Sequence, residues 1–199
     1  DERHAKFSDL PPLRELVSKY KNKEFNIEGY PSENFIEKVI NVKPHQVTLV
    51  PDPPGALTSS FGWDCEKNKS FLTDVVKEFH NHKIRVSLFI NPSKETLENL
   101  GIISTDRVEL YTYDYAHNYS ENKSEAIKSY VEVSKFIQSE FPKIEFNAGH
   151  DLNLENLEYF LKSITNIKEV SIGHALICDT FEFGLEKTIK KYLEITSKL

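Results

Sequence analysis

The sequence has few of the features that mark membrane-spanning or secreted proteins. No apolar run approaches the roughly 20 residues that a bilayer-spanning helix needs, and the longest run, residues 86–90, has only the length of a strand. The first residues are charged and are not followed by the apolar segment of a secretory signal. These absences argue against a membrane or secreted protein and favour a cytoplasmic one.

Cysteine is scarce and there is no excess of basic residues. Cys65 and Cys178 form no metal-binding or redox motif, so we expect two reduced thiols. The formal net charge is −6, from 31 acidic and 25 basic residues. A nucleic-acid partner is therefore not expected, because no global positive field would hold a phosphate backbone. Small phosphorylated ligands remain compatible with this charge, since loops and helix N-termini can bind them.

The 199 residues, 39% hydrophobic and 28% charged, have the composition of one globular domain, which we expect to cover residues 1–199. β-rich runs alternate with helical patterns. Strands are expected at residues 24–28, 46–50, 84–90, 106–111, 143–147 and 169–172. Helices are expected at residues 32–40, 66–80, 93–100, 124–141, 154–164 and 184–199, with Ser32 as a cap. Strict alternation predicts right-handed βαβ units and a parallel sheet.

Two α/β architectures fit this alternation: a (β/α)8 TIM barrel and a doubly wound open sheet. The open sheet is less favoured, because no glycine-rich dinucleotide fingerprint follows any strand. Polar residues gather at the carboxyl ends of the strands, where barrels have their active sites. About six strands can be counted, and the chain begins without Met in what looks like a charged loop. We therefore expect an incomplete barrel whose first two strands lie upstream of the given sequence.

Titratable groups lie at or near three strand ends. Glu28 closes one strand, Glu109 lies within another, and His150 follows a third. Two carboxylates and an imidazole are suited to moving protons around carbonyl and imine intermediates. The spacing alone is weak evidence, because a strand-end glutamate is more often solvated or part of an ion pair. Both interpretations stay open on the residues alone.

Two turns combine small residues with a histidine: residues 147–150 and residues 172–175. A glycine turn lets the backbone approach a ligand, and the histidine that follows can point inward. Barrels commonly hold a phosphate at the backbone amides after their last strands. The turns predict a phosphate pocket flanked by imidazoles, and the alternative is a pair of ordinary tight turns with surface histidines.

The other candidate residues are weaker. His45 precedes a strand, on the stability face of a barrel, and is predicted to be structural. His80 and His82 lie near a helix C-terminus, where positive charge is favourable. Trp63 follows a glycine and is either a lid or a packing residue. A cluster at one strand exit could line a substrate pocket or pack beneath a long loop: Tyr111, Tyr113, Tyr115 and Tyr119.

Seven short motifs follow one another along the chain. They lie at residues 1–4, 26–28, 43–51, 86–90, 108–110, 147–150 and 171–175. In this order they resemble the pyridoxine 5′-phosphate synthase family of vitamin B6 biosynthesis. The resemblance covers the whole chain, with one short insertion near residues 11–23.

The resemblance implies a ring-closing transferase. Its reaction would join 3-amino-2-oxopropyl phosphate to 1-deoxy-D-xylulose 5-phosphate, releasing phosphate and water as pyridoxine 5′-phosphate forms. It implies no metal and no organic cofactor. The implied partners are the two small phosphorylated substrates and further copies of the chain, because members of the family are octamers.

The resemblance also implies roles for individual residues. Glu28 corresponds to a proton acceptor, His150 to a proton donor, and Glu109 to the carboxylate that stabilises the transition state. Implied contacts with deoxyxylulose phosphate are His4 and Thr58, and those with the other substrate's phosphate are Gly173 and His174. Asp151 stands where the family has a glycine that contacts substrate.

Other departures also fall at the expected active rim. The family's basic loop is replaced by Asp52-Pro53-Pro54, its His-Thr-Gly by Tyr111-Thr112-Tyr113, and a Gly-Arg by Cys178-Asp179. A carboxylate such as Asp151 beside a phosphate would weaken binding by ~1 kcal/mol or more. These departures leave two alternatives open: the same barrel acting on a less phosphorylated substrate, or a non-catalytic relative that binds a metabolite or assembles with other subunits.

Overall fold

The computed structural model describes residues 2, 4–52, 55 and 60–197. The strands are β1 (Asn26–Gly29), β2 (Gln46–Leu49), β3 (Arg85–Ile90), β4 (Arg107–Tyr111), β5 (Glu145–Gly149) and β6 (Ile167–Ser171). The α-helices are α1 (Leu10–Ser18), α2 (Glu33–Val42), α3 (Lys69–Asn81), α4 (Leu100–Ile103), α5 (Tyr113–Ala126), α6 (Lys128–Glu140), α7 (Leu157–Ser163), α8 (His174–Phe183) and α9 (Leu185–Thr196). Short 3-10 helices are η1 (Phe7–Asp9) and η2 (Lys94–Thr96).

The strands form one sheet in the order β1–β2–β3–β4–β5–β6. The pairs β1–β2, β2–β3 and β5–β6 are parallel. Strands that are neighbours both in sequence and in the sheet are the product of successive βαβ units. The predicted α/β class is therefore confirmed. The chain divides into two compact units: a first unit of residues 1–91 and 95–108, and a second unit of residues 92–94 and 109–199.

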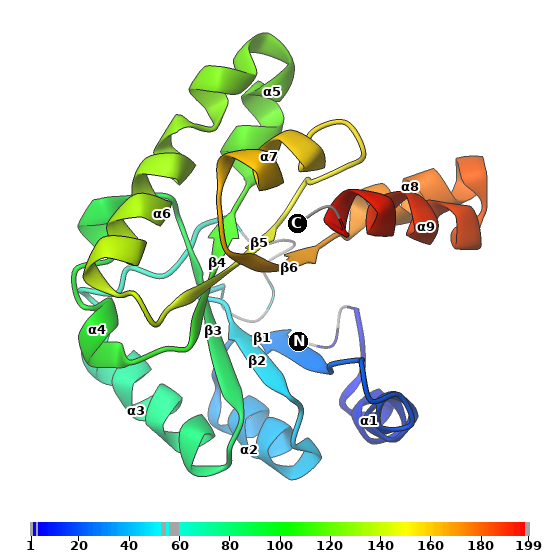
Figure 1. The fold of residues 1–199 in the computed structure, drawn as a ribbon. Coiled ribbons are helices and arrows are strands. Elements are labelled where there is room, and N and C mark those ends of the chain that lie inside the picture. The colour runs from blue at the N-terminus through cyan, green and yellow to red at the C-terminus, as the bar shows by residue number, and fades with distance from the viewer. Residues whose placement is uncertain (1, 3, 53–54, 56–59, 198–199) are drawn as a thin grey trace. The chain divides into compact units, whose positions relative to one another are not determined.

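In the first unit, α2 and α3 lie along the outer side of β1–β3 (Figure 1). Apolar side chains from strands and helices meet there, all of them buried: Ile27, Val39, Val47, Phe79 and Val86. The predicted cap of α2 is present, because the Phe35 backbone N–H donates to Ser32 Oγ at 3.2 Å. Polar residues in register, namely Glu28, Thr48 and Ser87, form a row across the same three strands.

Helix α1 was not expected, since the sequence suggested a charged loop near the start of the chain. Its first turn contains Pro11 and Pro12, and proline is well suited to the first helical positions because its φ angle is already helical. The helix is tied to the rest of the first unit by Arg14, whose Nε donates to the Lys43 carbonyl oxygen at 2.9 Å.

The helix predicted over residues 124–141 is present in the second unit as α6, and α5 is an additional helix that was not predicted. Helix α5 precedes α6, and Asn122 within α5 has non-helical backbone angles. Tyr115 of α5 packs against Tyr130 and Phe160, with ring centroids 6.0 and 5.0 Å away. Burial raises the pKa of both tyrosines. Within the tyrosine cluster, Tyr115 therefore serves for packing on a helix, whereas Tyr111 ends β4 and Tyr113 is exposed.

Helix α8 was also missed, and it pairs with α9 after β6 (Figure 1). All residues of α8 are described, and none is buried. Three large apolar side chains on this pair are 55%, 88% and 55% exposed: Ile177, Phe181 and Leu185. The sequence of α8 lacks the polar face by which a surface helix is recognised.

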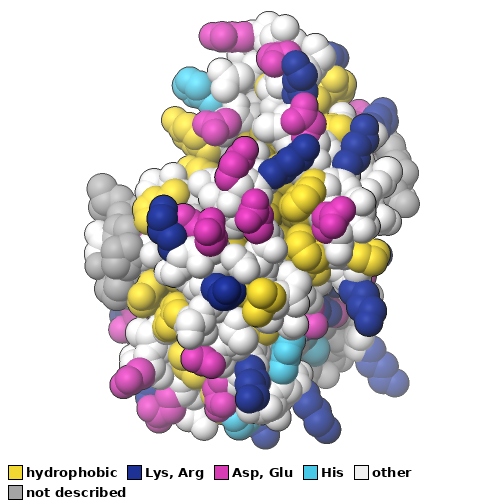
Figure 2. Space-filling model, turned by 90° about the vertical axis from the view of Figure 1, so that its left-hand side faces the viewer, with side chains coloured by type: hydrophobic (Ala, Val, Ile, Leu, Met, Phe, Trp, Pro, Cys, Tyr) yellow, Lys and Arg dark blue, Asp and Glu magenta, His cyan; other side chains and the backbone are white. Residues whose placement is uncertain are grey.

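The face shown in Figure 2 mixes acidic and basic side chains, with hydrophobic ones between them. No helix among the described residues is both long enough and apolar enough to cross a bilayer.

Candidate active site at the carboxyl ends of the strands

In the second unit, the carboxylate of Glu109 lies directly against the backbone of β5. Glu109 is the third residue of β4 and is 2% exposed. Its Oε1 occupies the space that a Cβ atom on Gly149 would need, and such a Cβ would also lie 3.1 Å from Ser171 Cβ. Gly149 is thus required by close approach. The strand ends of β4, β5 and β6 meet at this point.

The turn after Gly149 holds two successive residues in the left-handed region. His150 has φ 79° and Asp151 has φ 57°, values that side chains with a Cβ adopt at a free-energy cost. Thr112, which is fully buried, anchors the turn from β4. Its Oγ1 donates to the Gly149 carbonyl oxygen at 2.6 Å and contacts the His150 carbonyl oxygen, while its N–H donates to the Gly149 carbonyl oxygen at 2.9 Å.

A second anchor lies downstream of the turn. Asn156 is 2% exposed, and its Nδ2 donates to the Asp151 carbonyl oxygen at 3.1 Å. Its Oδ1 accepts from the Asn153 N–H at 2.9 Å, and its own carbonyl oxygen accepts from Tyr115 Oη at 2.6 Å. The strained turn is therefore fixed from both sides.

The half-buried ring of His150 meets Tyr111 edge to face, with ring centroids 5.0 Å apart and planes at 90°. Tyr111 is held in turn, because its carbonyl oxygen accepts from Tyr130 Oη at 2.8 Å. The predicted residues Glu109 and His150 thus come from neighbouring strand ends. Glu109 lies against Gly149, and Thr112 binds the carbonyl oxygens of Gly149 and His150. A buried carboxylate and a fixed imidazole can stabilise and move charge on a bound ligand.

The second predicted turn follows β6. Gly173 precedes α8 and His174 is its first residue, and both are exposed. Open space surrounds the position of a Cβ on Gly173 among the described residues. Ser171, two residues earlier, is the register partner of Gly149. Backbone amides at the start of α8 are of the kind that can bind phosphate, and a phosphate site at this turn stays a prediction.

The remaining predicted residues belong to the first unit or lie outside the described residues. Glu28 is exposed on β1, in register with Thr48 and Ser87. The Ser87 hydroxyl is buried and finds no hydrogen-bond partner among the described residues. His4 is exposed. Thr58 lies outside the described residues.

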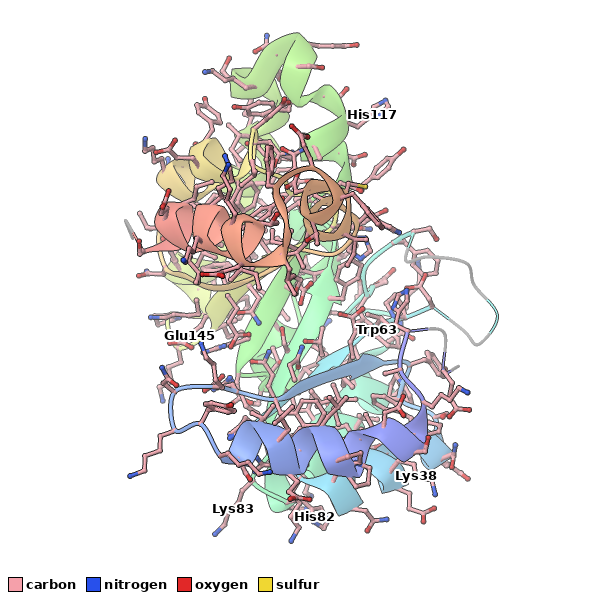
Figure 3. The ribbon with its side chains drawn as sticks, turned by 90° about the vertical axis from the view of Figure 1, so that its right-hand side faces the viewer. Lys38, Trp63, His82, Lys83, His117 and Glu145 are labelled. Atoms are coloured by element: carbon pink, nitrogen blue, oxygen red, sulfur yellow. The ribbon has the colours of Figure 1, made fainter. Side chains whose placement is uncertain are left out.

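Trp63 packs over the carboxyl ends of the first unit's strands and is 4% exposed. Its Nε1 donates to the Leu49 carbonyl oxygen at 2.9 Å, and its backbone N–H donates to the Phe89 carbonyl oxygen at 2.8 Å. Gly62 makes this possible, because a Cβ there would overlap the backbone of Ile90 and Asn91. Of the two interpretations of Trp63, the structure supports packing. Figure 3 shows Trp63 toward the carboxyl ends of these strands and Lys83 toward their amino ends.

Three histidines have contacts that suit structural roles. His45 Nδ1 accepts from the Phe25 N–H at 2.8 Å, His80 Nε2 lies 2.8 Å from Asp106 Oδ2, and His82 Nε2 lies 3.3 Å from Glu78 Oε1. Both cysteines are free thiols: Cys178 is exposed, and burial raises the pKa of Cys65 to about 12. Among the described residues there is no group of three His, Cys, Asp or Glu side chains that could hold a metal ion.

Thr112, Asn156 and the Asn147–Glu169 contact were not identified from the sequence. Asn147 Nδ2 donates to Glu169 Oε2 at 3.1 Å, across the β5–β6 pair. The only available signal was position, since Thr112 directly follows a strand and Asn147 lies inside one.

A sheet with polar groups at its strand ends, and with helices between its strands, defines an α/β protein. Its fold is similar to that of a mutant tryptophan synthase α-subunit from Pyrococcus furiosus, with a TM-score of 0.62 and 14% identity, over 98% of this chain and 75% of that one. The chain belongs to the family described as pyridoxal phosphate biosynthesis protein PdxJ, which it matches over residues 1–198.

Two relatives are named pyridoxine 5′-phosphate synthase. The one from Bacteroides fragilis is 50% identical over 192 residues, which cover 96% of this chain and 78% of the relative. The one from Cytophaga hutchinsonii is 47% identical over 198 residues, which cover 100% of this chain and 81% of the relative. The predicted family resemblance is therefore confirmed.

Proposed function

We propose that this protein is a pyridoxine 5′-phosphate synthase, which condenses 3-amino-2-oxopropyl phosphate with 1-deoxy-D-xylulose 5-phosphate. Membership of the family and about 50% identity to relatives of that name support an enzyme of vitamin B6 biosynthesis. The observation that carries the proposal is the buried carboxylate of Glu109, fixed against Gly149 beside the strained turn that holds His150. Backbone strain of this kind is concentrated at functional sites, so the turn supports a functional role for His150 and Asp151.

The proposed chemistry proceeds by proton transfer. Amine and ketone condense with loss of water, so a proton must be removed from a carbon or nitrogen and delivered to the departing oxygen. In the proposed roles, Glu28 accepts a proton and His150 donates one. Glu109, withdrawn from water, stabilises positive charge that develops on an imine nitrogen, because a buried carboxylate acts more strongly there than in water.

The proposed substrate contacts are those of the family resemblance. His4 and Thr58 would contact deoxyxylulose phosphate, while Gly173 and His174 would bind the phosphate of the amino ketone through the start of α8. Asp151 would lie beside substrate in place of a glycine. Its left-handed backbone is compatible with a position at which the family has glycine.

We also propose that the six-stranded sheet is part of a (β/α)8 barrel and that both units belong to that single domain. The similarity to the tryptophan synthase α-subunit supports this. The exposed apolar side chains of α8 and α9 are candidates for burial in a homo-oligomer. By resemblance this homo-oligomer would be an octamer, and sedimentation velocity would measure its mass. The unpaired Cys65 and Cys178 support a cytoplasmic location.

Purified protein that is supplied with both substrates should release pyridoxine 5′-phosphate. The product is measured by chromatography with fluorescence detection. His150→Ala and Glu109→Gln should each lower kcat/KM by roughly a hundredfold or more. His82→Ala, which removes a surface histidine paired with Glu78, is the matched control and should leave the rate unchanged. Folded protein that yields no product from these substrates would refute the proposal, and the two alternatives would then be tested by binding of less phosphorylated ketones.

A further inference from the structure

Asn147 lies in the middle of β5 with its amide orientation fixed by a neighbour. The side chain is 1% exposed, and its Nδ2 donates to Glu169 Oε2 at 3.1 Å. An ionised carboxylate can only accept hydrogen bonds, so the NH2 group of Asn147 must face Glu169. The Oδ1 atom of Asn147 therefore points away from Glu169, as an acceptor.

This Oδ1 atom is buried and has no hydrogen-bond partner among the residues that the structure describes. Buried acceptors in folded proteins are almost always paired, because leaving one without a donor destabilises the fold. Of the buried side-chain atoms without a partner among the described residues, Asn147 Oδ1 is the one that shares a strand with Gly149, and a donor supplied by a ligand would satisfy it.

The atom faces the candidate site. Alternate residues of a strand point to the same side of a sheet, so Asn147 shares its side with Gly149, against which the Glu109 carboxylate lies. On β6, the register partners of these two residues are Glu169 and Ser171. The second unit thus presents, on one side of its strands, two carboxylates and an amide oxygen.

Such a set selects the chemistry of its ligand. Carboxylate and amide oxygens repel a phosphate or a carboxylate, whereas they accept hydrogen bonds from a group rich in N–H donors. A protonated primary amine has three N–H donors and no acceptor, so it can donate to Asn147 Oδ1 and to Glu169 at the same time. A hydroxyl has a single proton and can satisfy one of them.

We propose that Asn147 and Glu169 bind the amino group of the amino-ketone substrate, an inference that rests on the proposed synthase function. The phosphate of the same substrate would lie at the start of α8, which follows β6, so that the two ends of one molecule are recognised along a single strand. Glu169 aligns the Asn147 amide and attracts the positive charge of the amine.

The test compares Asn147→Leu and Glu169→Gln with the unchanged protein. Each variant should raise the KM for 3-amino-2-oxopropyl phosphate about tenfold and leave the KM for 1-deoxy-D-xylulose 5-phosphate unchanged. The preference for 3-amino-2-oxopropyl phosphate over 3-hydroxy-2-oxopropyl phosphate, measured as the ratio of their binding constants by calorimetry, should fall by a similar factor. Glu145→Gln is the matched control: Glu145 begins the same strand, near Lys168 at 3.5 Å, and should change none of these values (Figure 3).

Calorimetry separates this inference from the synthase function, because binding needs no turnover. If the protein forms no product yet prefers the amine, and the variants lose that preference, the synthase function fails and the amine site stands. A rise in KM for the deoxyxylulose phosphate alone would assign both side chains to that substrate's hydroxyl groups and overturn the proposal. Unchanged constants in both folded variants, verified by circular dichroism, would also overturn it, since Asn147 would then face bound water only.

Discussion

In the first unit, the carboxyl ends of β2 and β3 are joined by one aromatic residue, whereas in the second unit the turn after β5 is held by short polar side chains. Trp63 binds the Leu49 and Phe89 carbonyl oxygens through its indole and backbone N–H groups. Thr112 and Asn156 bind the carbonyl oxygens of residues 149–151. The first arrangement fixes strands, and the second fixes the direction of a histidine.

The difference predicts which strand ends carry chemistry. Trp63 donates two hydrogen bonds, but its buried indole also fills space, and this apolar packing tolerates small adjustments because it is not directional. The hydroxyl and amide contacts of the second unit are directional and hold His150 and Asp151 in backbone conformations that they would otherwise avoid. Small changes near Gly149 should therefore impair catalysis, while changes near Trp63 should impair stability.

The most severe test of this contrast is Gly149→Ala. The new Cβ would overlap Glu109 Oε1 and crowd Ser171 Cβ, so the carboxylate must move. Displacing a catalytic group by about 1 Å can lower a rate roughly a hundredfold, and we expect such a loss in kcat/KM with the fold retained by circular dichroism. Adding Glu109→Asp, which shortens the side chain, should relieve the overlap. A fully active Gly149→Ala protein would contradict the geometry assigned to Glu109.

The opposite behaviour is expected for Trp63→Phe. The change removes the hydrogen bond to the Leu49 carbonyl oxygen and leaves a small cavity in a site that is 4% exposed. We expect the free energy of unfolding in urea to fall by about 2 kcal/mol, with kcat/KM nearly unchanged. A large loss of activity at unchanged stability would instead make Trp63 part of the substrate site and remove the contrast between the units.

The elements that could be predicted from the sequence are those with periodic patterns. The strands and α2, with its Ser32 cap, have alternating or helical hydrophobic spacing. Helix α5 consists of polar and aromatic residues without an apolar stripe, and α8 is apolar without a polar face, so neither gave a helical pattern. Glu109 and His150 could be proposed because they lie in or after a strand.

Contacts that depend on register could not be predicted. Thr112 contacts residues 37 and 38 positions further along the chain, and Asn147 contacts Glu169 through a pair of strands with a register irregularity beside Asn147. A one-residue shift of register would turn each of these side chains to the other face. A candidate site could thus be proposed from the sequence, but the hydrogen bonds that support its residues could not.

Thr112→Val keeps the shape of the side chain and removes its hydroxyl. The turn would lose its anchor to Gly149 and His150, so we expect kcat/KM to fall about tenfold. Thr112→Ser, which keeps the hydroxyl, should recover most of the activity. Because a purely structural role would lower stability without altering protonation, the pH profile of kcat/KM is the deciding measurement. An unshifted profile in Thr112→Val would mean that Thr112 does not position His150.

The smallest effect is expected for Asp151→Gly. Glycine adopts the left-handed backbone without strain, although it loses more conformational freedom on folding, so the free energy of unfolding should rise by only about 0.5–1 kcal/mol. Lys83→Gly is the matched change in the first unit, since Lys83 is exposed and has φ 60°. Both variants should gain similar stability in urea titrations. Only Asp151→Gly should also lower the KM for a phosphorylated substrate, because it removes a negative charge beside the site. Equal KM values for both variants would place Asp151 outside the substrate's reach, and its strain would then serve His150 alone.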